Sequence, residues 1–326
     1  MRQDKGKREG LNIAVEDSPL SGRRSAGRFV SMPYRTRRRL FLVMMAAPAV
    51  LYVVLVALWP LCQGIYYSFF DYNLIRPNSR SWEGFGNYVR LWSDDTARTA
   101  LINTFIFSIG AVALEFVLGL AIAFLLWRDD LFNRVCLSLL LIPATVTPLV
   151  VGLIFKAMLN ADYGVIGYFL TQWRVSGDHG LLGETSTALA TLIVIDAWEW
   201  TPLMALILLA GLKSLPTDIL EAAQVDGARP LQRFRMIILP LLLPSAFLAL
   251  VIRMMDTFRV FDIIFVTTAG GPGDATNTLM IYSVKEGLQF FNIGFASAIA
   301  NVTTICIGVM AAVFILVVRP AGERHG

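Results

Sequence analysis

The decapeptide EAAQVDGARP, Glu221–Pro230, lies between two of the most apolar stretches of the chain, at about 187–212 and 240–267. It carries Glu221, Asp226 and Arg229, whereas each flanking stretch is made largely of aliphatic side chains. Both stretches are long enough to cross a bilayer, and polar groups are costly inside hydrocarbon. The chain is therefore expected to leave the membrane at this decapeptide and to re-enter it after about residue 239.

Working outward from this segment, the rest of the chain repeats the same alternation. Of its 326 residues 56% are hydrophobic and only 16% are charged, against roughly 25% charged in soluble domains. Six apolar blocks are long enough to span a membrane; they lie at about 40–70, 99–127, 135–159, 187–212, 240–267 and 290–318. We predict an all-α, polytopic membrane helix bundle with six transmembrane helices. The first block exceeds the bilayer thickness and is expected to tilt, protrude or kink at Pro48 or Pro60.

The distribution of charged residues predicts on which side of the membrane the two termini lie. The segment 1–39 is polar and rich in arginine, and lysine and arginine favour the cytoplasmic side of a membrane. An even number of spans puts both termini on that side. We predict a multi-pass membrane protein with a basic cytoplasmic tail at 1–39, a six-span domain at 40–319 that contains the cytoplasmic segment 213–240, and a cytoplasmic C-terminus at 320–326. A basic tail could also indicate nucleic acid, but beside a membrane span we interpret it as a cytoplasmic flank. We expect membrane lipid, and no nucleic acid, among the partners of the chain.

The sequence indicates no metal site. Cys62, Cys136 and Cys306 lie in or at the ends of apolar blocks, where we expect small apolar side chains in a helix bundle. His179 and His325 are far apart and have no cysteine neighbours. The chain also lacks a G-x-x-x-x-G-K-[ST] loop, so we expect it to bind no ATP in the usual way.

Within the cytoplasmic segment the residue pattern predicts two short helices. Ser214 is a candidate N-cap before Pro216, and Gly227 is a natural helix terminator. Pro230 favours the first turn of a second helix, which we expect to end at Pro240, where the fifth span begins. The small alanines are expected on one exposed face. Such a segment is either a linker against the bundle and lipid headgroups or a docking helix for a cytosolic partner.

Glu221-Ala222-Ala223, followed by Gly227 and then by Ile238-Leu239-Pro240, resembles the EAA loop of ABC importer permeases, most closely the maltose-type subunits of carbohydrate importers. The resemblance extends from about residue 38 onward. Supporting motifs are Gly84-Phe85-Gly86-Asn87-Tyr88, Trp198 with Thr201-Pro202, Arg259-Val260-Phe261-Asp262 and Gly270-Gly271-Pro272. The chain departs from the maltose archetype because it lacks two extra N-terminal spans and a large periplasmic insertion.

The resemblance implies the type I ABC importer permease fold and a non-enzymatic subunit that conducts a carbohydrate or sugar derivative. It implies these partners: a second homologous permease, two cytosolic ATPases that hold ATP and Mg, and an extracytoplasmic substrate-binding protein. It implies no cofactor in this chain. The implied ATPase-coupling residues are Glu221, Ala222, Ala223, Asp226, Gly227 and Pro240.

Ionisable residues inside the predicted spans are candidates for a substrate pathway, because charges are costly in a membrane. Arg253, Asp256, Arg259 and Asp262 recur every three residues and are expected on one helix face, where an internal salt-bridge ladder is the competing interpretation. An anionic substrate would require an unpaired arginine, Arg253 or Arg259. The aromatic faces that a sugar favours are available from Trp198, Trp200, Phe258 and Phe261. The candidate pathway residues are Asp196, Trp198, Glu199, Arg253, Asp256, Phe258, Arg259, Asp262 and Asn301, with Glu115 as a further buried acid.

Two other functions remain open at this point. An ion-coupled secondary transporter would use buried acids such as Asp196, Asp256 and Asp262 to carry protons. A membrane enzyme would require a clustered nucleophile and base, and the sequence shows neither. The cytoplasmic segment favours the importer, because a proton-driven transporter has no need of a docking helix for an ATPase.

Overall fold

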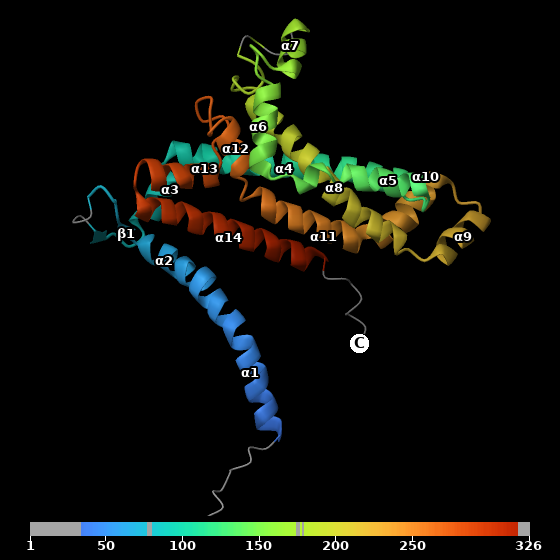
Figure 1. Cartoon of the computed structure of the whole chain (residues 1–326), viewed down its shortest axis with the longest axis horizontal. Coiled ribbons are helices and arrows are strands. Elements are labelled where there is room, and N and C mark those ends of the chain that lie inside the picture. The colour runs from blue at the N-terminus through green and yellow to red at the C-terminus, as the bar shows by residue number, and fades with distance from the viewer. Residues whose placement is uncertain (1–33, 77–79, 174–176, 178, 319–326) are drawn as a thin grey trace, which may run out of the picture. The chain divides into compact units, whose positions relative to one another are not determined.

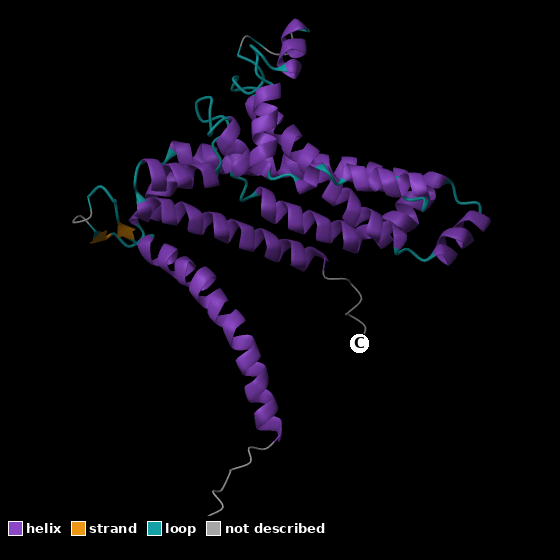
Figure 2. Cartoon of the chain, viewed as in Figure 1, coloured by secondary structure: helices purple, strands orange, loops and turns teal. Residues whose placement is uncertain are grey.

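The computed structural model describes residues 34–76, 80–173, 177 and 179–318. Residues 1–33 of the predicted tail and the predicted C-terminus at 320–326 lie outside this part. The described chain is mostly helical (Figure 2). Its strands, β1 (Phe70–Asp71) and β2 (Ser81–Trp82), pair antiparallel as a small hairpin. The chain divides into two units, 1–56 and 57–326, and each is described on its own.

The first apolar block forms α1 (Tyr34–Val53), a five-residue π-helix (Val54–Leu58) and α2 (Trp59–Tyr67). Pro48 lies inside α1, and Pro60 lies in the first turn of α2. Proline has no backbone N–H to donate to the preceding turn. The π-helix directly before Pro60 is the kind of local irregularity that lets a helix continue through a proline.

The larger unit is built around α4 (Asp95–Leu125) and α8 (Ala188–Lys213), which pack along each other. Helix α11 (Leu239–Thr257) packs against both, and α14 (Ile293–Val318) packs against α11 and α2. Gly119 allows the close approach of α4 to α8, because a Cβ there would lie 2.8 Å from the Met204 side chain and 3.0 Å from the Ala205 nitrogen. Small residues serve this purpose in membrane helix pairs.

Five helices of the described residues are long and apolar enough to cross a membrane; they are 41–67, 95–125, 188–213, 230–257 and 293–314. They account for five of the six predicted spans. The third predicted span, 135–159, is not one helix. It consists of α5 (Leu131–Leu140), a 3₁₀ turn (Pro143–Thr145) and α6 (Pro148–Met158). Pro143 and Pro148 each begin a new helical segment, as prolines do, and α6 turns away from α5 (Figure 1).

The fifth block also differs from the prediction of a single helix to residue 267. Helix α11 ends at Thr257, where Arg259 and Val260 donate to the carbonyls three residues before them and so close the last turn. A separate helix, α12 (Asp262–Thr267), then packs against α6. Shorter elements complete the unit: α3 (Gly86–Ser93), α7 (Val165–Gln172), α9 (Thr217–Val225), α10 (Pro230–Arg233), a π-helix (Phe234–Ile238), α13 (Leu279–Val284) and a π-helix (Lys285–Gln289).

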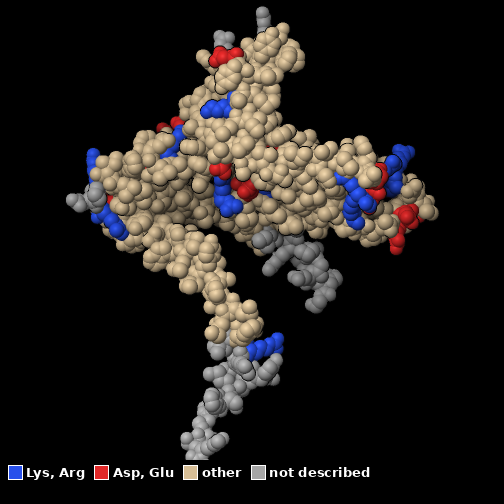
Figure 3. All heavy atoms as spheres, viewed as in Figure 1, with Lys and Arg blue, Asp and Glu red and all other residues tan. Residues whose placement is uncertain are grey.

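Charged side chains gather at the two ends of the larger unit, and the surface between these ends is largely uncharged (Figure 3). A small group of both signs interrupts this surface midway along the face that is shown, and further charges lie on the projection that contains α6 and α7. An uncharged band between two polar ends is the distribution expected of a bundle that spans a bilayer.

Candidate functional site

The polar segment after α8 forms a helix and a sharp turn at one end of the larger unit (Figure 1). Ser214 follows the last residue of α8 and donates its hydroxyl to the Gly211 carbonyl, so the predicted N-cap role of Ser214 is wrong. Helix α9 instead begins at Thr217, after Pro216. Ser214 and Pro216 therefore lie in the short connection between α8 and α9.

Gly227 ends α9 as predicted. It has a φ of +74°, in the left-handed region that glycine adopts without strain. The Asp226 and Ala228 N–H groups donate to the carbonyls of Ala222 and Ala223, respectively, and so satisfy the free end of the helix. The chain then reverses and starts α10 at Pro230, also as predicted.

Pro240 does not separate two helices, in contrast to the prediction. Residues 230–257 form one continuous apolar helix, because a π-helix at Phe234–Ile238 carries the backbone past Pro240. Helix α10 therefore continues directly into α11.

The six candidate coupling residues differ in exposure. Glu221, Ala222, Asp226, Gly227 and Pro240 are exposed, whereas Ala223 is 8% exposed and packs inward. The prediction that the alanines share an exposed face is therefore wrong for Ala223. Successive helical residues are about 100° apart, so two adjacent alanines necessarily point in different directions. The accessible part of the segment is an acidic and small-residue surface on α9.

A second cluster of candidate residues lies inside the bundle and is centred on Arg253, which is 1% exposed. The Arg253 guanidinium donates to both oxygens of Glu115 at 2.7 and 2.8 Å, to Asp196 at 2.9 Å and to Asp256 at 2.7 Å. It also lies 4.7 Å from the ring centroid of Trp200. The cluster joins α4, α8 and α11 through one side chain.

This geometry changes the sequence interpretation in two respects. Arg253 is fully paired, so it is not the unpaired arginine that an anionic substrate would require. Arg259 is exposed and appears in none of the ion pairs within the described residues. Of the predicted ladder on one helix face, the Arg253–Asp256 ion pair is formed. The ladder does not continue, because Arg259 lies beyond the end of α11 and Asp262 begins α12.

Four of the predicted pathway residues line a common cavity of about 110 Å³: Asp196, Asp256, Arg259 and Asp262. Trp200 and Phe261 supply its aromatic walls. The cavity thus combines carboxylates, one guanidinium and flat rings, which are the groups that hydrogen-bond hydroxyls and stack on apolar ligand faces.

The other predicted pathway residues lie elsewhere in the bundle. Trp198 packs edge-on against Phe155 at 5.2 Å, and Phe258 is buried against Phe105 at 5.0 Å. The Asn301 amide donates to the Tyr88 hydroxyl at 3.3 Å.

Glu199, the remaining predicted pathway residue, has an unusual environment. It is fully buried, and neither of its carboxyl oxygens has a hydrogen-bond partner among the described residues. The residue is adjacent in sequence to Trp200 but does not line the cavity.

Pro148 and Thr257 line the same cavity, although the sequence did not single them out. Pro148 is brought there by the break in the third predicted span. The close spacing of Pro143 and Pro148 in the sequence indicates this break. It does not indicate that Pro148 will lie beside the end of α11 and the start of α12.

With this geometry established, comparison with known proteins decides the family. Residues 115–321 match the model of the family described as binding-protein-dependent transport system inner membrane component. The chain belongs to this family. The matched region contains the segment 213–240, the Arg253 cluster and the cavity.

Curated relatives agree with this assignment. The chain is 37% identical over 277 residues to a probable ABC transporter permease protein of Sinorhizobium fredii, covering 82% of this chain and 87% of the relative. It is 32% identical to the trehalose transport system permease protein SugA of Mycobacterium tuberculosis, with 90% and 94% covered. It is 36% identical to the trehalose/maltose transport system permease protein MalF of Thermococcus litoralis, with 72% and 79% covered.

Solved structures show the same fold. A bacterial ABC transporter that imports the acidic polysaccharide alginate superposes with a TM-score of 0.76 at 20% identity, over 88% of this chain and 98% of that chain. The chain is therefore a multi-pass membrane permease subunit of the ABC importer type, as the EAA-like segment indicated. The ion-coupled alternative has no support from these relatives.

Proposed function

We propose that this permease conducts a carbohydrate or sugar derivative across the bacterial inner membrane. The observation that carries the proposal is the set of relatives at 32–36% identity, which are named for trehalose, for trehalose and maltose, and for sulfoquinovosyl glycerol. These substrates share a polyhydroxylated ring. The chain's own cavity offers carboxylates and a tryptophan face for such a ring.

The proposal places the segment 213–240 and both termini in the cytoplasm. There α9 receives a cytosolic ATPase subunit, which binds ATP and Mg, while this chain catalyses no reaction and holds no cofactor. Glu221, Ala222, Asp226 and Gly227 are accessible to that subunit, and Ala223 packs α9 inward. Because α10, the π-helix and α11 are continuous through Pro240, displacement of α9 is transmitted towards Arg253.

A complete importer on this proposal contains this chain, a second homologous permease, two ATPases and an extracytoplasmic binding protein. The solved alginate transporter that resembles this chain was crystallised with a periplasmic protein that carried an alginate pentasaccharide. The family description likewise names binding-protein-dependent transport.

The Arg253 cluster braces the bundle in this scheme, and the adjoining cavity forms part of the substrate path. Asp256 and Asp262 accept hydrogen bonds from sugar hydroxyls, Trp200 stacks on a ring face, and Arg259 is the cation available to an anionic derivative. Asp196 borders the cavity but remains bonded to Arg253.

The test is co-expression of the chain with its genomic neighbours, purification of the complex, and measurement of ATP hydrolysis and sugar uptake in liposomes. We expect Glu221→Ala to lower uptake at least tenfold while the complex still assembles or, if docking fails, to lose the ATPase subunit. Asp162→Ala, which removes an exposed acid in the loop between α6 and α7, is the matched control. Wild-type uptake by Glu221→Ala would refute the coupling role, and purification of a lone chain without ATPase would refute the proposed assembly.

A further inference from the structure

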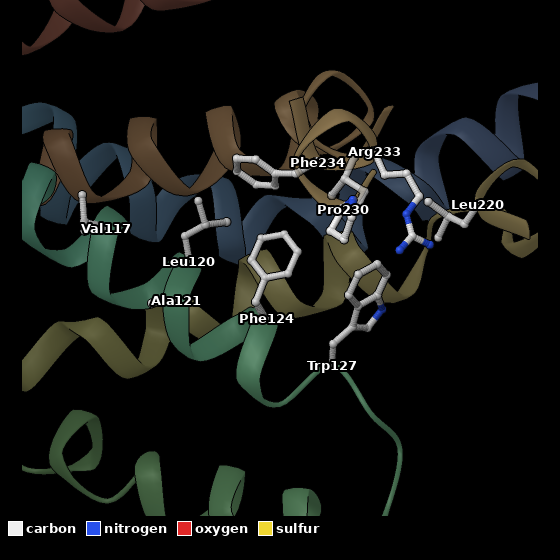
Figure 4. A pocket seen from close by; sticks show the side chains of 10 residues that line it. Val117, Leu120, Ala121, Phe124, Trp127, Leu220, Pro230, Arg233 and Phe234 are labelled. Atoms are coloured by element: carbon white, nitrogen blue, oxygen red, sulfur yellow. The ribbon is translucent and has the colours of Figure 1, made fainter. Parts of the chain in front are cut away.

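An apolar groove of about 550 Å³ runs beside the coupling segment (Figure 4). One wall is the last part of α4, with Val117, Leu120, Ala121 and Phe124, followed by Trp127. The opposite wall consists of Leu220 from α9, then Pro230, Arg233, Phe234 and Ile238. All of these side chains except Arg233 are apolar or aromatic, so the groove has one cationic position.

The single cation lies at one end of the groove. In Figure 4, Arg233 and Trp127 are at the same end, with Leu220 beside them, and Val117 is at the other end. From Val117 to Trp127 there are ten residues, or about 15 Å at 1.5 Å per helical residue. The hydrocarbon core of a bilayer is about 30 Å thick, so one leaflet is about 15 Å thick. The groove therefore has the length of one leaflet.

The hydrogen-bond partner of Arg233 is a neutral group. Arg233 is half-buried and donates to the neutral amide oxygen of Gln224 at 3.3 Å. No carboxylate within the described residues lies at ion-pair distance from it. By contrast, Arg134 and Lys213 both pair with Asp129, at 3.1 and 3.5 Å, and these cations lower the pKa of the Asp129 carboxyl.

We propose that this groove binds one anionic phospholipid of the inner leaflet. An acyl chain lies along Val117, Leu120 and Phe124, and the phosphate pairs with Arg233 beside the interfacial ring of Trp127. The inference relies on the cytoplasmic placement of the segment 213–240 given above. A one-leaflet length, an apolar lining and a cation at the polar end match a phospholipid and do not match a soluble sugar or nucleotide.

The occupant would contact the moving part of the permease. Leu220 immediately precedes Glu221 on α9, and Phe234 belongs to the π-helix that leads into α11. A bound lipid therefore bridges α4 to both elements of the coupling segment, which gives the inner leaflet a direct contact with the ATPase-docking helix.

The test is native mass spectrometry of the complete detergent-purified complex after incubation with phosphatidylglycerol or phosphatidylcholine. We expect one retained phosphatidylglycerol per copy of this chain and about fivefold weaker retention in Arg233→Gln, the factor that one cation contributes at an anionic membrane surface. Ala121→Phe, which fills the groove from an exposed position, should also release the lipid. Arg235→Gln is the matched control, because it removes the same charge two residues away and does not line the groove.

A photo-cross-linking amino acid at Ala121 identifies the occupant independently of binding strength. A cross-link to lipid in membranes supports the proposal, whereas a cross-link to another subunit overturns it and assigns the groove to a protein interface. Equal retention of both lipids, or unchanged retention in Arg233→Gln and Ala121→Phe, also overturns it. These measurements require neither transport nor ATP hydrolysis, so their failure is distinguishable from failure of the proposed transport function.

Discussion

Replacing Arg253 by glutamine tests the buried charge cluster most directly. In the wild-type chain, one guanidinium neutralises Glu115 and Asp196, whose side chains are 0% and 6% exposed. Arg253→Gln leaves these two buried carboxylates without a cation. Breaking a buried ion pair by removal of one partner costs about 3–5 kcal/mol, which is a factor of roughly 10² to 10⁴ in the folded population.

The assay is thermal unfolding of the purified complex, followed by intrinsic fluorescence. At roughly 2–4 °C per kcal/mol for a chain of 150–250 residues, we expect the melting temperature of Arg253→Gln to fall by about 6 °C or more. Asp256→Asn is the control, because the Asp256 side chain is 50% exposed and its ion pair is screened by water; such a pair contributes about 1 kcal/mol or less.

A compensating variant separates charge from packing. The triple change Glu115→Gln, Asp196→Asn and Arg253→Met removes all three buried charges together, and we expect it to recover most of the lost stability, since neutral replacements of buried ion pairs are often tolerated. The reasoning is refuted if Arg253→Gln melts within 2 °C of the wild type. It is also refuted if the triple variant is less stable than Arg253→Gln.

Three further predictions concern the backbone and its caps. Gly227→Val should impair uptake into liposomes, because a β-branched residue is strained at a φ of +74°. Gly227→Asn should retain uptake in the same assay, because asparagine tolerates this region and a Cβ at this position meets nothing within 4 Å. Gly294→Ala should sharply lower the yield of folded protein, because its Cβ would collide with the Phe70 carbonyl, whereas Gly308→Ala, which has open space, should leave the yield measured by fluorescence size-exclusion chromatography unchanged. Asp94→Ala should lower the melting temperature more than Tyr282→Phe does. Asp94 caps α4 by accepting from the Thr96 and Ala97 N–H groups, and it also accepts a hydrogen bond from the Tyr282 hydroxyl at 2.7 Å. Tyr282→Phe removes only the second of these interactions, a hydrogen bond of about 1–2 kcal/mol.

Several features of this protein were determined by the sequence alone, because they depend on local chemistry. Long apolar blocks cannot leave their backbone polar groups unpaired in a bilayer, so they form helices whatever their neighbours are. The turn at Gly227 and the helix start at Pro230 were predictable for a similar reason, since each follows from the φ angles that one residue permits. The resemblance to ABC importer permeases likewise came from the sequence, through the spacing of Glu221, Gly227 and Pro240.

Only the tertiary structure decided which charges meet. Glu115 and Arg253 are 138 residues apart and form a bidentate ion pair. The periodicity within one helix cannot reveal a contact between two helices. Pro240 looked like a helix boundary but lies in a continuous helix, because the backbone absorbs its missing N–H in a π-turn. Arg253 and Arg259 have the same charge and similar sequence surroundings. One braces the bundle and the other faces a cavity, because α11 ends between them, and the packing of separate helices determines what each guanidinium can reach.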